Sequence, residues 1–130
     1  MDAIRRVLVV DDDRDLCDLL ADFLRDEGYE VARAYAGREA LDSAKRAVPD
    51  AVLLDLMLPD ISGLTVGQAL RADAATERVK LVVISGDRGA LAAGRAALGG
   101  ALFLEKPFSL DAIEVAVRDA LGRDGPAAGA

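Results

Sequence analysis

The chain has 130 residues, 52% of them hydrophobic and 30% charged, a composition typical of one globular domain with a real core. Its 16 basic and 23 acidic residues give a net charge of −7, which disfavours direct binding to nucleic acid or to an anionic membrane. One cysteine, no histidine and no apolar run of membrane-spanning length exclude an internal disulfide, a zinc site with His ligands and a membrane span. These features, together with an N-terminus that does not resemble a signal peptide, indicate a cytoplasmic protein.

Short apolar runs alternate with segments of helical periodicity along the whole chain. Strands are expected at residues 5–10, 29–34, 52–55, 79–84 and 101–104. Helices are expected after the first strand with a stop at Gly28, at 37–47, 63–72 and 88–98, and after a cap at Ser109. Asp13 is interpreted as the cap of the first helix and Cys17 as a packing residue of it. We expect one domain over residues 1–121 and a flexible tail or linker start over 122–130, which is rich in Gly, Pro and Ala.

Five strand–helix alternations predict an α/β fold with a doubly wound, five-stranded parallel sheet. In the flavodoxin-like strand order 2-1-3-4-5, the ends of strands 1, 3, 4 and 5 face one crevice. Those ends carry Asp11 with Asp12, Asp55, Ser85 and Lys106. Three carboxylates in one pocket tolerate ionisation only with a cation among them, and an oxygen-only ligand set favours Mg²⁺.

Asp55 is the candidate nucleophile of this pocket. A carboxylate, a Mg²⁺ ion, a hydroxyl from Ser85 and an ammonium from Lys106 are the parts needed to transfer a phosphoryl group onto Asp55. The simpler alternatives are that Asp55 only opens a turn and that Lys106 is a surface lysine. A Lys-Pro-Phe sequence directly after a buried strand is an unusual surface pattern, which favours the functional interpretation.

Four motifs carry a resemblance to a known family. In these motifs the chain resembles response-regulator receiver domains of the chemotaxis-regulator type, the phosphoacceptor modules of two-component signalling. The resemblance covers about residues 7–121, and its motifs are Val9-Val10-Asp11-Asp12-Asp13, Asp55-Leu56-Met57-Leu58-Pro59 with Gly63, Ile84-Ser85-Gly86, and Lys106-Pro107-Phe108.

The resemblance implies that Asp55 accepts a phosphoryl group from a histidine kinase or a histidine phosphotransfer protein. It also implies that Asp12 binds Mg²⁺ directly and that Asp11 assists through water or proton contacts. The backbone carbonyl of Met57 would supply a third protein contact to the metal.

It further implies that Ser85 and Lys106 grip the phosphoryl group, that the Lys106–Pro107 peptide is cis, and that Phe103 is the switch aromatic. Phe103 could instead be an ordinary core residue. The chain would then be a switch that catalyses its own phosphorylation and dephosphorylation, rather than a turnover enzyme. Phosphorylation would alter the face made by the fourth helix, fifth strand and fifth helix. That face would bind a downstream protein, a fused effector domain or a second copy of the chain.

Three rival interpretations give the chain a different function. A haloacid-dehalogenase-like phosphatase needs a second Asp where this chain has Met57, and a flavodoxin needs a phosphate cradle where it has Asp11 to Asp13. A receiver that is never phosphorylated and serves only for docking stays open.

The acidic loop residues and the segment 86–100 depart from a simple family pattern. Asp60 and Asp87 are interpreted as solvated loop acids, and the resemblance implies that Asp87, two residues past Ser85, tunes dephosphorylation. Segment 86–100 is about one residue short and rich in Gly and Ala, which predicts a mobile fourth helix.

Overall fold

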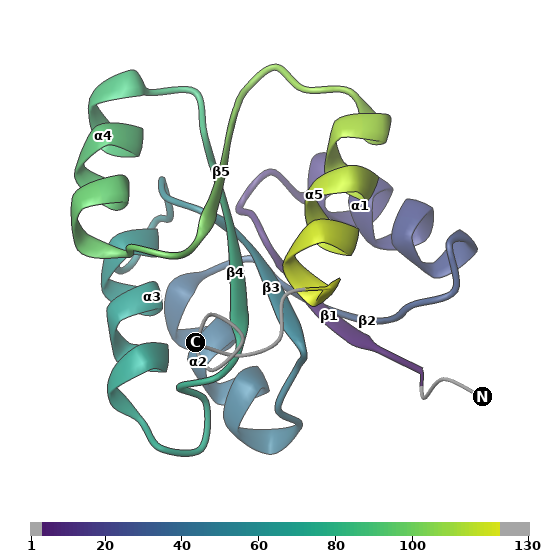
Figure 1. Ribbon diagram of the computed structural model, residues 1–130, viewed down its shortest axis with the longest axis horizontal. Coiled ribbons are helices and arrows are strands. Elements are labelled where there is room, and N and C mark those ends of the chain that lie inside the picture. Colours follow the sequence, from purple (N-terminus) through teal and green to yellow (C-terminus); the bar gives the residue numbers. More distant parts are fainter. Residues whose placement is uncertain (1–3, 123–130) are drawn as a thin grey trace.

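The computed structural model describes residues 4–122 as a five-stranded parallel sheet between two layers of helices (Figure 1). The sheet order is β2-β1-β3-β4-β5, which confirms the predicted flavodoxin-like arrangement. Its strands are β1 (Arg6–Val10), β2 (Glu30–Ala34), β3 (Ala51–Asp55), β4 (Lys80–Ser85) and β5 (Leu102–Glu105). The helices are α1 (Arg14–Asp26), α2 (Gly37–Arg46), α3 (Gly63–Ala72), α4 (Arg88–Ala97) and α5 (Leu110–Gly122).

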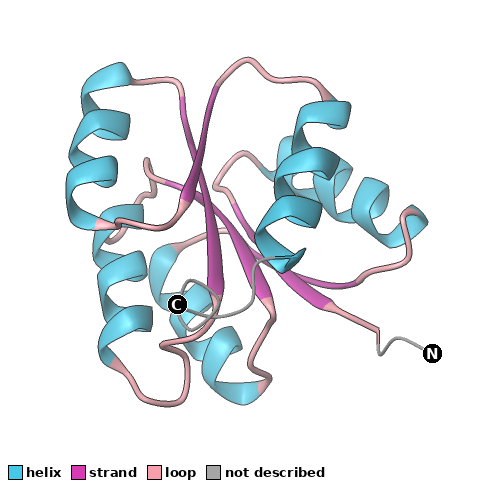
Figure 2. Cartoon of the chain, in the orientation of Figure 1, coloured by secondary structure: helices cyan, strands magenta, loops and turns pink. Residues whose placement is uncertain are grey.

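Each face of the sheet contributes to a separate hydrophobic core, because successive side chains along a strand point to opposite faces. Figure 2 shows α1 and α5 on one side of the strands and α2, α3 and α4 on the other. Leu8, Val52 and Val83 belong to the core beneath α2, α3 and α4. Val9 and Leu53 belong to the core beneath α1 and α5. The central strands are therefore apolar on both faces, and this explains their continuous hydrophobic runs.

Helices α1 and α5 begin directly after the residues that were expected to cap them, Asp13 and Ser109. Asp13 Oδ1 accepts the Leu16 N–H at 3.1 Å, and Ser109 Oγ accepts the Ala112 N–H at 3.0 Å. Gly28 has a φ of 100° just beyond α1, a conformation that glycine adopts without a steric penalty. Cys17 is fully buried in the α1 side of the core, as expected of a packing residue.

Boundaries differ from the prediction by one residue at several strand ends. Strands β4 and β5 both begin and end one residue later than expected, so that they include Ser85 and Glu105. The cause is that backbone pairing continues to the Ser85–Glu105 pair after the apolar pattern has stopped. The expected tail starts at Gly122, which is the last residue of α5; residues 123–130 lie outside the described part of the chain. No helix within residues 4–122 is long and apolar enough to cross a membrane.

Candidate functional site

Four neighbouring strands deliver the polar residues of the site to one edge of the sheet. Asp11 follows the last residue of β1, Asp55 ends β3, Ser85 ends β4, and Lys106 follows the last residue of β5. Because β1, β3, β4 and β5 are adjacent and parallel, these residues meet at the carboxyl edge (Figure 1). The structure therefore brings the predicted residues together.

Three carboxylates form a compact cluster at this edge. One oxygen each from Asp11, Asp12 and Asp55 lie within 4.8 Å of one another. Asp11 is 0% exposed and Asp55 is 3% exposed, while Asp12 is open to solvent. The cluster therefore has a buried inner pair and one exposed member through which an ion from solvent can reach it.

The ammonium of Lys106 bridges the two buried carboxylates. Its Nζ lies 3.0 Å from Asp55 Oδ2 and 3.2 Å from Asp11 Oδ2. Burial disfavours the charged ammonium, but the hydrogen bond and charge of Asp55, together with those of Asp11, outweigh it and raise the pKa of Lys106. Lys106 is therefore held as a cation between the carboxylates.

Backbone N–H groups fix the remaining carboxylate oxygens. Asp55 Oδ1 accepts the Met57 N–H at 2.9 Å, and Asp11 Oδ1 accepts the Asp13 N–H at 2.9 Å. Each acid thus closes a two-residue Asx turn at the end of its strand. The same contact fixes the backbone of Met57, whose side chain is 58% exposed.

Gly63 lets the start of α3 approach the end of β3 more closely than any other residue could. A Cβ at this position would lie 2.2 Å from the Asp55 carbonyl oxygen and 2.6 Å from Leu56 Cα. The Gly63 N–H donates to the Leu56 carbonyl at 2.9 Å. The glycine therefore positions the backbone that carries Asp55.

The site has an excess of negative charge. Burial, more than any other cause, raises the pKa of the Asp11 carboxyl to about 6, and the nearby Asp55 charge acts in the same direction. Three carboxylates against the single ammonium of Lys106 leave two uncompensated negative charges when all are ionised. Oxygen donors with this excess fit one divalent hard cation such as Mg²⁺.

Ser85 ends β4 at the edge of the sheet that carries this cluster, and Phe103 lies within β5, three residues before Lys106. Ser85 is fully buried, and its Oγ accepts the Asp87 N–H at 3.0 Å, so that its own hydrogen remains available to donate. Phe103 is half-buried and packs on the α4 side of the sheet. There the Arg95 guanidinium lies 5.2 Å from the ring centroid. The Lys106–Pro107 peptide is cis, as predicted.

Two acids interpreted as solvated are exposed but have structural partners. Asp60 accepts the N–H groups of Gly37 at 2.8 Å and Arg38 at 2.9 Å, which caps α2. Asp87 Oδ1 accepts the Ala90 N–H at 3.1 Å, which caps α4. An acid just before a helix is a capping signal that would have identified Asp87. Asp60 gives no such signal, because the helix it caps lies more than twenty positions earlier in the chain.

Known proteins match most of this chain. The family model described as "Response regulator receiver domain" matches residues 7–118. The DNA-binding response regulator MtrA of Mycobacterium bovis is 46% identical over 82 residues, which is 62% of this chain and 36% of MtrA. The response regulator MprA of Mycolicibacterium vanbaalenii is 38% identical over 125 residues, 96% of this chain and 54% of MprA.

Solved structures give the same result for the fold. The chemotaxis protein CheY4 of Vibrio cholerae has a TM-score of 0.83 at 27% identity, covering 91% of this chain and 99% of that one. A CheY-like receiver domain protein from Methanospirillum hungatei has a TM-score of 0.83 at 23% identity, covering 92% of this chain and 94% of that one, and so supports the fold alone. The chain spans about half or less of the length of the curated relatives it matches.

Proposed function

Because the chain belongs to the response regulator receiver domain family, we propose that Asp55 accepts a phosphoryl group from a phosphohistidine. The donor would be a histidine kinase or a histidine phosphotransfer protein. The observation that carries the proposal is the position of Asp55, buried at a strand end, 3.0 Å from Lys106 and clustered with Asp11 and Asp12. A solitary turn-forming aspartate would need none of these neighbours.

In the proposed transfer, an Asp55 carboxylate oxygen attacks the phosphorus atom while the bond from phosphorus to the donor imidazole nitrogen breaks. The imidazole leaves with the electron pair and takes up a proton, and the product on Asp55 is an acyl phosphate. Lys106 is placed to neutralise charge on the phosphoryl oxygens, because its ammonium already contacts the attacking carboxylate.

Receiver domains generally bind Mg²⁺ at an acidic pocket, and this chain has the matching aspartate cluster. We infer that Asp12 and Asp55 hold the ion directly, with the Met57 carbonyl as a third contact and Asp11 assisting. When bound, the ion would neutralise charge on the transferred phosphoryl group. The two uncompensated negative charges of the pocket support this assignment.

The output is a change of surface rather than release of a product. Ser85 would donate its hydroxyl hydrogen to the phosphoryl group, and Phe103 would turn inward as Ser85 moves. Because Phe103 packs beside α4, this movement would reshape the face made by α4, β5 and α5. A downstream protein, a fused effector domain or a second copy of the chain would bind there. MtrA, named as a DNA-binding response regulator, makes a DNA-binding effector the leading case.

The proposal is tested by intact-mass analysis after incubation with Mg²⁺ and a small phosphodonor such as acetyl phosphate. Wild type and Asp42→Asn, a control at an exposed acid of α2 outside the cluster, should each gain one phosphoryl group. Asp55→Asn should gain none, and a chelator should prevent the gain in wild type. Wild type that stays unmodified while Mg²⁺ fails to bind would contradict the proposal and favour a receiver used only for docking.

A further inference from the structure

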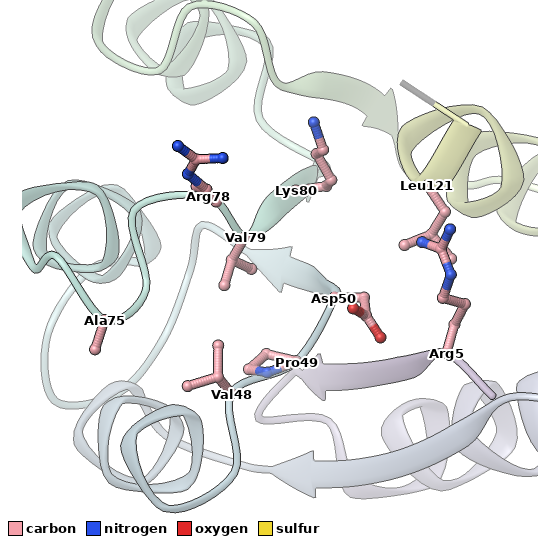
Figure 3. Close-up of a pocket in the computed structure, with 9 residues that line it drawn as sticks. All are labelled: Arg5, Val48, Pro49, Asp50, Ala75, Arg78, Val79, Lys80 and Leu121. Carbon is pink, nitrogen blue, oxygen red and sulfur yellow. The ribbon is translucent and has the colours of Figure 1, made fainter. Parts of the chain in front are cut away.

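A second site candidate lies at the opposite edge of the sheet from the aspartate cluster. Figure 3 shows this cavity of about 330 Å³, between the starts of β1, β3 and β4 and the end of α5. Its volume falls at the lower end of the range for small-molecule sites, about 300 to 1,000 Å³. The cavity is therefore large enough for a small ligand.

Three cations from two separate segments line the cavity. Arg5 directly precedes β1, Lys80 is the first residue of β4, and Arg78 lies two residues before it. In Figure 3, Arg78 and Lys80 extend toward the same side of the cavity, and Arg5 lies beside Leu121. The only carboxylate among the lining residues is that of Asp50.

These cations are not neutralised by the protein. Within residues 4–122, none of Arg5, Arg78 and Lys80 has a carboxylate within 4.0 Å, so their charges are open to a ligand. Asp50 Oδ2 accepts the Arg6 N–H at 2.7 Å, and its carboxylate remains negatively charged. The lining residues therefore carry three positive charges and one negative charge in a chain of net charge −7, and salt screens the rest of the surface beyond about 8 Å.

The cavity also has an apolar wall. Val79 and Pro49 are buried beneath it, while Val48 is 43% exposed although its side chain is aliphatic. Leu121 closes the opposite side. An aliphatic or aromatic group placed on Val48 would remove apolar surface from water.

We propose that this cavity binds a small organic phosphate. Its phosphate group lies at Arg78 and Lys80, whose side chains extend toward the same side of the cavity, and its organic part packs on the apolar wall. Arginine and lysine are the side chains that most often recognise phosphate, and the pair Arg78 and Lys80 comes from one short segment that β4 holds in place.

The site is physically separate from the proposed phosphorylation site. Asp50 comes directly before β3 and lines the cavity, whereas Asp55 ends β3 at the other edge of the sheet. Without a divalent cation, the aspartate cluster repels a free phosphate. Binding measured in the presence of a chelator therefore reports on the cavity alone.

The test is a titration of the isotopically labelled chain with adenosine monophosphate in EDTA, followed by amide NMR, with inorganic pyrophosphate as a second arm. We expect saturable shifts at the amides of Arg5, Asp50, Arg78 and Lys80. Saturation by adenosine monophosphate would support the proposal, whereas saturation by pyrophosphate alone would overturn it in favour of a site for free phosphate groups.

Variants decide whether the cavity is responsible. The double variant Arg78→Gln/Lys80→Gln should weaken binding roughly tenfold, since each exposed cation contributes a modest amount. Arg38→Gln, an exposed cation on α2 away from the cavity, should bind as wild type does. Unsaturated shifts of equal size in all three proteins, each with a wild-type circular dichroism spectrum, would overturn the proposal.

Discussion

Replacing Gly63 by Ala tests how β3 and α3 together position Asp55. The added Cβ would lie 2.2 Å from the Asp55 carbonyl oxygen, where ordinary contact begins at 3.4 Å. Both clashing groups are backbone, so no side chain can rotate away, and α3 must move by roughly 1 Å. The movement stretches the 2.9 Å hydrogen bond from the Gly63 N–H to the Leu56 carbonyl.

We expect this change to lower the free energy of unfolding by about 3 kcal/mol. Overpacking against an unyielding wall costs about 1–3 kcal/mol, and the hydrogen bond contributes about 1 kcal/mol. With a urea dependence of about 2 kcal/mol per molar, the midpoint of urea unfolding should fall by roughly 1.5 M.

Gly99→Ala is the matched control, because a Cβ there meets nothing within 4 Å. Its unfolding midpoint should stay close to that of wild type. If Gly63→Ala unfolded at the wild-type urea concentration, the close approach of α3 to Asp55 would be wrong.

Three further predictions follow from buried or capping groups. The N–H groups of Arg38 and Gly37, which donate to Asp60 at the start of α2, lower the pKa of Asp60 from 3.8 to about 2. The stabilisation that this contact gives the folded chain is complete above about pH 4 and is lost as the pH falls toward 2. Wild type should therefore unfold at a higher urea concentration than Asp60→Ala at pH 7, and this difference in unfolding midpoint should shrink by pH 2.5. A difference in midpoint that stayed the same at both pH values would contradict the role of Asp60 as a cap of α2. Burial raises the pKa of the Cys17 thiol to about 11, so a thiol reagent at pH 8 should modify Cys17 only in urea, and rapid modification of the native chain would contradict its burial. Thr76→Val removes a buried hydroxyl that donates to the Leu70 carbonyl at 2.6 Å, and it should lower the free energy of unfolding in urea by about 1 kcal/mol. Thr65→Val, the control on the surface, should not lower it measurably.

The strand order and the meeting of Asp11, Asp55 and Lys106 could be predicted from the sequence. Continuous apolar runs in the central strands indicate burial on both faces, and parallel strands place their carboxyl ends together. The polar residues at the ends of β1, β3, β4 and β5 therefore identify the site from the sequence.

Other features could not be predicted because they depend on distant partners. The contact of Asp60 with the start of α2 joins positions far apart in the chain, and no local pattern encodes it. The positioning role of Gly63 could not be predicted, because its close approach to the Asp55 carbonyl is set by how α3 packs. The last residues of β4 and β5 were missed because hydrogen bonds, rather than hydrophobicity, decide where pairing stops.

The most direct test of the central proposal is to locate the phosphoryl group on the chain. After incubation with Mg²⁺ and acetyl phosphate, borohydride reduction converts an aspartyl phosphate to homoserine, and tryptic digestion yields a peptide covering residues 47–71. That peptide contains three aspartates, Asp50, Asp55 and Asp60, so fragment masses can distinguish them. We expect homoserine at position 55 alone. Homoserine at position 50 or 60, or none in a chain that binds Mg²⁺, would contradict the assignment of Asp55 as the phosphoacceptor.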